Sequence, residues 1–184
     1  MGGFCQGNGP SMSKNVAIFD IATNQWLSGP DMRFPRIQYV FFFLNDTILV
    51  IFANHFHNYF FSFSAVVANG KIFVIGGIVG NSTSCEVLDV EESPNQWKYI
   101  SSMRYPRVGC AAAVFNNQII VSGGGYGDTI STSTEIYDIE NDSWTLAENM
   151  KIPRNEHQLV VIPRDNIEDS ESAVDSVLKK YSNF

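Results

Sequence analysis

The chain has 184 residues and a mass of 20.5 kDa, and 45% of its residues are hydrophobic while 17% are charged. These values are typical of a soluble globular protein and exclude a chain that is disordered throughout. The formal net charge is -7, and the sequence has no cluster of Lys and Arg that would track a phosphate backbone. Charge therefore argues against a nucleic-acid partner.

The N-terminal residues show no basic region followed by an apolar run, which a secretory signal would need. Cys5, Cys85 and Cys110 are odd in number and widely spaced, so we expect reduced thiols in a cytoplasmic protein. Gln6 occupies the place where a myristoylation signal has Ser or Thr. The segment Ile37–Ala53 is apolar, but Asn45-Asp46-Thr47 interrupts it at the centre. We interpret it as a hairpin and expect no membrane association.

A repeat of 47 residues dominates the middle of the chain. The segment Asn69–Gly77 recurs as Asn116–Gly124, and Trp97 recurs as Trp144. Between these landmarks, Val87-Leu88-Asp89 recurs as Ile136-Tyr137-Asp138.

Each tryptophan is followed six residues later by Met and nine residues later by Pro-Arg. The three copies are Trp26/Met32/Pro35-Arg36, Trp97/Met103/Pro106-Arg107 and Trp144/Met150/Pro153-Arg154. Three copies of one spacing indicate a structural repeat.

This pattern of hairpin, double glycine, Tyr-Asp-like pair, Trp, Met and Pro-Arg resembles the Kelch repeat, whose units are the four-stranded blades of a β-propeller. The resemblance covers most of residues 1–162. It implies an all-β fold, an incomplete Kelch-type propeller with a short C-terminal tail or helix. The structural repeat residues are Trp26, Gly76, Gly77, Trp97, Gly123, Gly124 and Trp144.

The residues fit those places. Asn69-Gly70 suits the positive φ angles of a type I′ hairpin between two inner strands, and Ala111–Phe115 with Gln118–Ser122 forms the next inner pair. The glycine pairs would end the second strand of each blade, where the backbone turns away. By resemblance, Trp97 and Trp144 would wedge between neighbouring blades.

The spacing predicts an incomplete ring. Trp26 and Trp97 are 71 residues apart, where two repeats would need 94, so about half a blade is missing. We expect Leu44–Ile51 to be an inner hairpin without outer strands. The predicted partition is partial blades over 1–63, whole blades over 64–103 and 108–150, and a partial strand over 158–162, all within a propeller domain of 1–162.

Two explanations fit an incomplete ring: a truncated product of a longer Kelch protein, which we favour, or a protomer that self-associates or completes its ring with another chain. After Pro163 the composition becomes polar and acidic. Val174, Val177, Leu178 and Tyr181 recur at helical spacing, so residues 163–184 are predicted to be an acidic tail with a short amphipathic helix.

Catalytic and metal signals are weak. His55 and His57 share one face of a predicted strand, but no Asp, Glu or Cys stands at ligand spacing, so we expect no metal site and no cofactor. The run Gly123–Gly127 lacks the Lys-Ser/Thr of a phosphate loop. His157 has no nucleophile motif nearby, and we expect no enzyme.

The resemblance implies a module that binds another protein. One large Kelch group selects substrates for a cullin-based ubiquitin ligase through added BTB and BACK domains, which this chain lacks; the alternatives are an actin-binding Kelch protein and, less favoured, a fragment of a sugar-active enzyme. Partner contact is expected from the loops after the double glycines and around Pro-Arg. For each arginine, a structural hydrogen bond is an equal alternative. The candidate residues are Asn81, Ser82, Arg104, Tyr105, Arg107, Tyr126, Asp128, Arg154 and Asn155.

Overall fold

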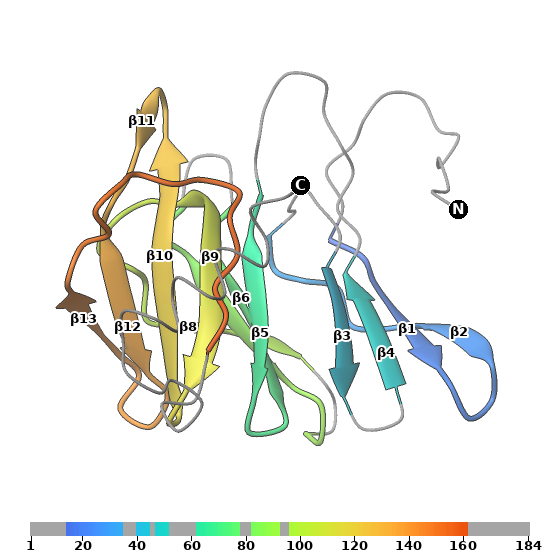
Figure 1. Cartoon of the computed structure of the whole chain (residues 1–184). Coiled ribbons are helices and arrows are strands. Elements are labelled where there is room, and N and C mark those ends of the chain that lie inside the picture. The colour runs from blue at the N-terminus through green and yellow to red at the C-terminus, as the bar shows by residue number, and fades with distance from the viewer. Residues whose placement is uncertain are drawn as a thin grey trace, which may run out of the picture.

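A computed structural model of the chain describes residues 14–34, 40–44, 47–51, 62–77, 82–92 and 96–161, with only the backbone in 40–44 and 47–51. Within these ranges the chain forms antiparallel strands β1–β13 and no helix. The predicted all-β class is confirmed. The strands make three sheets, each with the form of a propeller blade (Figure 1).

The middle blade has the strand order β5-β6-β7-β8. Its strands are β5 (Ser64–Ala68), β6 (Lys71–Ile75), β7 (Cys85–Asp89) and β8 (Trp97–Ile100). Asn69 and Gly70 join β5 to β6 with φ angles of 51° and 71°. Two positive φ angles match the twist of the flanking strands, as the sequence predicts for this hairpin.

The C-terminal blade has the order β9-β10-β12-β13, with β11 added on β10. Its strands are β9 (Val108–Phe115), β10 (Gln118–Tyr126), β11 (Thr129–Ile130), β12 (Thr134–Asp138) and β13 (Ser143–Ala147). The inner strands are longer than predicted. β10 continues past the double glycine because Gly125 and Tyr126 pair with β11, and Gly125 also pairs with Val108 of β9.

The N-terminal sheet corrects the prediction of a half-blade without outer strands. Its order is β2-β1-β4-β3, and its strands are β1 (Val16–Asp20), β2 (Gln25–Ser28), β3 (Val40–Leu44) and β4 (Thr47–Ile51). The β3–β4 hairpin supplies the inner pair, and the earlier β1–β2 hairpin supplies the outer pair. An unpaired strand edge exposes N–H and C=O groups. The pairing of β1 with β4 satisfies the facing edges of the two hairpins. We call this sheet the composite blade.

The blades stand side by side with their innermost strands β3, β5 and β9 adjacent, as Figure 1 shows. Two apolar layers fill the spaces between them. The layer between the composite and middle blades contains Val16, Met32, Phe63, Ile72, Val74, Leu88 and Trp97. The layer between the middle and C-terminal blades contains Val66, Ala68, Phe73, Ile75, Cys85, Met103, Cys110, Ile119, Val121 and Tyr137.

The glycine pairs lie where one blade meets the segment that leaves it. Gly76 and Gly123 have φ angles of 68° and 62°. A Cβ at Gly76 would stand 2.5 Å from the Arg107 carbonyl oxygen, and one at Gly123 would stand 2.3 Å from that of Arg154. Both positions need glycine for its conformation and for its lack of a side chain.

Residues 151–161 form no strand, although the sequence predicts an innermost strand that begins at Gln158. A strand needs a continuous ladder of hydrogen bonds to a neighbour. Within the described residues this segment makes only isolated backbone bonds, such as that of the Glu156 N–H to the Gly109 carbonyl of β9 at 2.7 Å. Ile162 and the predicted tail, 163–184, lie outside the described residues.

Candidate functional site

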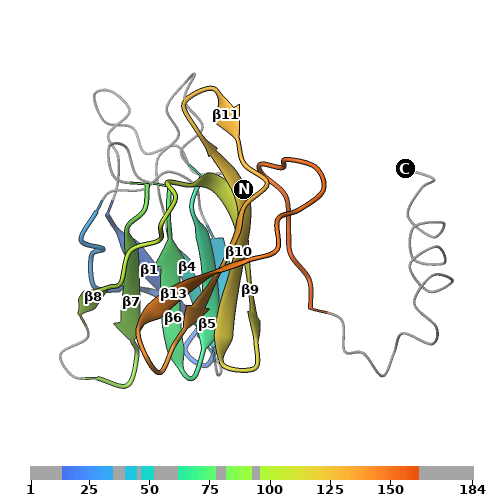
Figure 2. The ribbon, with the colours of Figure 1, turned by 90° about the vertical axis from the view of Figure 1, so that its left-hand side faces the viewer.

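Three segments meet at one end of the middle and C-terminal blades. Val108 at the start of β9 pairs with Gly125 near the end of β10. The chain that leaves β13 returns to the same place, because the Gly124 N–H donates to the Arg154 carbonyl at 2.8 Å. Figure 2 shows the β11 hairpin at this end. We call it the loop end; it consists of residues 103–107, 126–130 and 151–155.

Arg107 is fully buried at the loop end, so the structure assigns it to packing and not to partner contact. All five of its N–H groups donate. Nε and Nη2 reach Glu135 Oε1 at 3.2 and 2.9 Å, and Nη1 reaches the carbonyls of Gly123 and Ser133 at 2.6 and 2.9 Å. Nη2 also donates to Ser133 Oγ at 2.8 Å. The guanidinium thus joins the exit of the middle blade to the C-terminal blade.

Glu135 organises the loop end, and sequence reasoning missed it. Besides Arg107, its carboxylate accepts the N–H groups of Arg104 at 2.8 Å and Tyr105 at 3.2 Å. One blade earlier, Glu86 accepts the N–H of Arg33 at 2.9 Å. Both glutamates are fully buried. The available signal is that Glu stands directly before the repeated apolar pair and Asp in both repeats.

Ser82 is also withdrawn from the surface. It is 2% exposed, and its carbonyl accepts the Arg107 N–H at 3.0 Å. Its position beside this exit segment explains the burial and removes it from the contact candidates. Asn81 lies outside the described residues.

The remaining candidates are exposed and gather at the loop end. Tyr105 and Tyr126 are 40% and 56% exposed, and the Arg104 guanidinium carbon lies 5.9 Å from the centre of the Tyr105 ring. The other exposed polar candidates there are Asp128, Arg154 and Asn155. Two exposed isoleucines that the sequence did not single out, Ile130 and Ile152, lie in the same segments. Glu135 holds the backbone of Arg104 and Tyr105, so these two side chains stand on an ordered turn.

The tryptophans have different surroundings in the three blades. The Trp97 indole N–H donates to the Pro30 carbonyl at 3.0 Å, and the Trp144 indole N–H donates to the Ser101 carbonyl at 2.7 Å. Each bond therefore crosses to the preceding blade. The accepting residue stands four positions after the preceding blade's own tryptophan: Pro30 after Trp26, and Ser101 after Trp97. Trp26, in the composite blade, is 57% exposed and packs against Phe19 with ring centroids 5.0 Å apart.

Residues 60–104 and 106–151 match the family model of the Kelch motif. The chain belongs to the Kelch-repeat family. No curated protein is significantly similar to it in sequence. Among solved structures, "Structure of YjhT" is 15% identical, covers 66% of this chain and 43% of its own, and has a TM-score of 0.49. A fungal alcohol oxidase of the AA5 family in complex with copper is 24% identical, covers 50% of this chain and 23% of its own, and has a TM-score of 0.44. This Kelch chain spans less than half the length of either protein.

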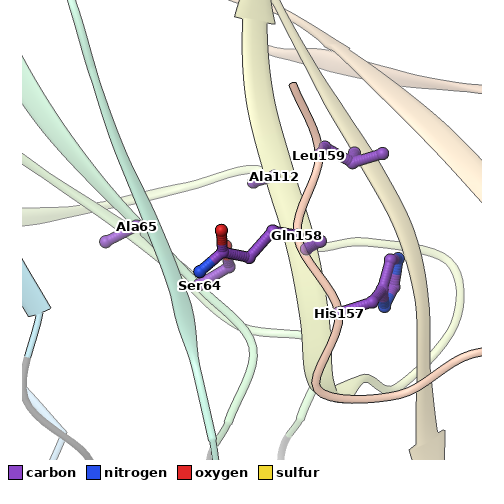
Figure 3. Close-up of a pocket in the computed structure, with 7 residues that line it drawn as sticks. Ser64, Ala65, Ala112, His157, Gln158 and Leu159 are labelled. Carbon is purple, nitrogen blue, oxygen red and sulfur yellow. The ribbon is translucent and has the colours of Figure 1, made fainter. Parts of the chain in front are cut away.

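A small cavity opens between β5 and β9, the innermost strands of the middle and C-terminal blades. Its volume is about 210 Å³. Figure 3 shows Ser64 and Ala65 on the β5 side and His157, Gln158 and Leu159 on the segment beside β9. The lining is one imidazole and one amide among small and apolar side chains, and none of the lining residues is Asp, Glu, Lys or Arg.

His157 approaches a serine inside the Kelch fold. Its Nε2 lies 2.9 Å from Ser122 Oγ, and Ser122 is 2% exposed. Burial, and secondarily the charge of Arg154, lowers the pKa of His157. His157 Nδ1 is buried and has no hydrogen-bond partner among the residues that the structure describes, so none of these residues orients the ring as a third group. The N–H groups of Gly123 and Gly124 already donate to carbonyls, so neither is available to an oxyanion.

The described residues contain no group of three or more His, Cys, Asp or Glu side chains that could hold a metal ion. His55 and His57, the histidine pair of the predicted strand, lie outside them, as does Cys5. Cys85 and Cys110 are buried and form no disulfide within the described residues. Within the described ranges, no helix is long and apolar enough to cross a membrane.

Proposed function

We propose that this chain is a protein-interaction module whose contact surface is the loop end. The observation that carries the proposal is the gathering of exposed Arg and Tyr side chains from separate loops on a backbone that buried Glu135 and Arg107 hold in place. Arginine and tyrosine combine large contact area with directed hydrogen bonds and are enriched at the centres of interfaces. Loops on a rigid scaffold are also the usual place for recognition residues.

Within this class we place substrate recognition for a cullin-based ubiquitin ligase in the cytoplasm first and actin binding second. Both propose a protein partner, and neither requires catalysis by this chain. The binding proposal is preferred to an enzymatic one because, among the described residues, no third group orients His157 and the neighbouring Gly123 and Gly124 N–H groups are already bonded to carbonyls.

The test compares two matched variants of the full chain as bait. Arg104→Ala with Tyr126→Ala removes contact area at the loop end. Lys98→Ala with Phe115→Ala removes an exposed cation and an exposed aromatic outside it. Quantitative affinity capture followed by mass spectrometry should lose the specific partners with the first pair and keep them with the second.

A third bait, with residues 165–184 deleted, separates the loop end from the acidic tail. If this deletion abolishes capture while the folded loop variant still binds, the loop end is not the recognition surface. Sedimentation with filamentous actin and the presence of a cullin among the captured proteins distinguish the two finer proposals.

A further inference from the structure

His157 stands at a repeat position that is apolar in the two preceding units. The units are offset by 47 residues, so Phe63 and Cys110 correspond to His157, and these two residues are 4% and 6% exposed. The facing residue changes as well. The Cys110 thiol lies 4.0 Å from the Ile75 carbonyl, whereas His157 faces Ser122, which corresponds to Ile75. One contact between repeats has therefore exchanged an apolar pair for a titratable and a polar side chain.

The imidazole of His157 is held at one of its two nitrogens. Nε2 lies 2.9 Å from Ser122 Oγ, and Nδ1 is buried with no hydrogen-bond partner in the described part of the chain. This arrangement fits a neutral ring whose Nε2–H donates to the serine and whose Nδ1 carries a lone pair. A second proton would place a buried N–H at Nδ1 without an acceptor among the described residues, which is unfavourable.

The charged groups on the ring's own segment do not compensate a second proton. Arg154 carries a like charge, and with burial it lowers the pKa of His157. The Glu156 carboxylate is directed to Ser62, whose hydroxyl donates to it at 3.4 Å. Figure 3 shows the imidazole and the Gln158 side chain on opposite sides of this segment.

The strands around the ring add no carboxylate that faces it. β10 places Gly123 against the imidazole, because a Cβ at Gly123 would stand 2.7 Å from His157 Cε1. Arg107 donates to the Gly123 carbonyl and is paired with Glu135. β9 contributes the Cys110 thiol, and β5 contributes Ser64–Ala65 to the neighbouring cavity. A charged imidazole would therefore lie without a counter-ion in the described structure.

The segment that carries His157, residues 154–161, is attached to the C-terminal blade by isolated bonds. The Gly124 N–H donates to the Arg154 carbonyl at 2.8 Å, and the Glu156 N–H donates to the Gly109 carbonyl at 2.7 Å. Glu156 has a φ angle of 52°, a left-handed conformation that is unfavourable for a residue with a side chain. A segment without a ladder can open while the strands beside it stay folded.

We propose that the His157–Ser122 contact is an acid-sensitive joint, and that protonation of the imidazole releases residues 154–161 from β9 and β10. The released ring is hydrated and carries a proton on both nitrogens, which the closed ring accommodates poorly. Acid therefore favours the released form, because only that form binds the second proton well. The corresponding contact of Cys110 with Ile75 has no group that titrates between pH 5 and 7.5 and stays closed.

Release also removes Arg154 and Asn155 from the loop end. This consequence rests on the proposed function, whereas the joint is a property of the chain by itself. The experiment therefore uses the full chain without a partner, so that the joint and the proposed function can fail separately.

Hydrogen–deuterium exchange at pH 7.5 and 5.0, corrected for the intrinsic effect of pH on exchange, measures the opening directly. The reporters are the Gly124 and Glu156 amides, which donate across the contact between the segment and the blade. Their protection should fall about ten- to thirtyfold at pH 5.0, as for a ring that titrates near 6.5 when released and at lower pH when closed. Peptides that cover β12 provide the reference within the same chain.

His157→Gln keeps a polar side chain that does not titrate, so the protection of both reporters should no longer depend on pH in this variant. His157→Cys with Ser122→Ile copies the contact of the preceding unit and should behave in the same way. Thermal melts verify folding, and His157→Gln decides alone if the double variant does not fold. Unchanged protection in the wild-type chain, an equal fall in His157→Gln, or an equal fall in β12 overturns the joint.

Discussion

Arg107 and Arg154 occupy equivalent places in successive repeats, yet one is completely buried and the other is exposed. Their backbones make the same hydrogen bonds. The difference lies in the neighbouring blade, because the C-terminal blade covers Arg107 and supplies Glu135 as its ion partner at 2.9 Å. No later blade covers Arg154 among the described residues. In this fold the role of a repeat residue is set by the neighbouring blade as well as by its own.

The tryptophans show the same contrast between a covered and an uncovered repeat position, here at the composite blade. Trp97 is 2% exposed because the composite blade lies against it, whereas Trp26 in the composite blade is 57% exposed. One residue type at one repeat position thus contributes very different buried area. Stability should therefore concentrate at the two contacts between blades.

Arg107→Ala should be the most damaging of the arginine changes. It leaves the Glu135 carboxylate buried with its charge uncompensated, and breaking a buried pair typically costs about 3 to 5 kcal/mol. Arg154→Ala should change the free energy of unfolding by no more than about 0.5 kcal/mol, as for other surface positions. Urea unfolding of both variants measures the contrast. Similar losses would mean that Arg154 is also covered in solution.

Trp97→Ala should cost about 3 to 5 kcal/mol, because it removes a large buried ring and the indole bond to Pro30. Trp26→Ala should cost about 1 kcal/mol, the range of a single aromatic pair with Phe19. Thermal melts with matched protein concentrations test this difference. A large loss at Trp26 would show that the composite blade's outer face is covered.

Much of the fold could be predicted from the sequence because the repeat is local. The Asn69-Gly70 turn, the double glycines and the outer pair of the C-terminal blade each lie within one 47-residue unit. The composite blade does not, since β1 pairs with β4 across a connection that no local pattern specifies. Asp20 was a signal by which the sequence of β1 could have been aligned with those of β7 and β12. Its carboxylate accepts the N–H of Ala22, as the Asp138 carboxylate accepts that of Glu140.

The sequence could predict which loops form the loop end, but not which of their side chains are exposed. The sequence placed Arg104, Arg107 and Arg154 in one class because all three surround Pro-Arg repeats. Burial separates them, and burial depends on Glu135, which lies 28 residues beyond Arg107. Spacing alone cannot distinguish a guanidinium that faces solvent from one that faces the next blade.

Gly123→Ala should cost about 2 to 4 kcal/mol, since it combines a left-handed backbone with a close approach to the Arg154 carbonyl. Gly127→Ala is the matched control. Its φ is 60°, but a Cβ there meets nothing within 4 Å, so only the backbone cost of about 1 to 2 kcal/mol should remain. Chemical unfolding measures the loss of stability in both variants, and the difference between the two losses is the cost of the contact with the Arg154 carbonyl. Equal losses would show that the exit segment moves away from the glycine freely.

The smallest expected effect is a pH dependence from His157. Burial lowers its pKa below the ordinary 6.5, so the unfolded chain binds a proton before the folded chain does. The free energy of unfolding should therefore fall as the pH falls from 6.5 to the lower pKa of the folded state, and should be fully retained above 6.5. His157→Gln removes this step. The pKa values of the Asp138 and Asp142 carboxylates are lowered from 3.8, so their contribution to the free energy of unfolding is lost as the pH falls below that value and not in the interval just below 6.5. Urea unfolding of both chains at pH 7.5, 6.0 and 5.0 should show their difference changing as the pH falls below 6.5. A constant difference would mean that the His157 ring is as well hydrated in the folded chain as in the unfolded one.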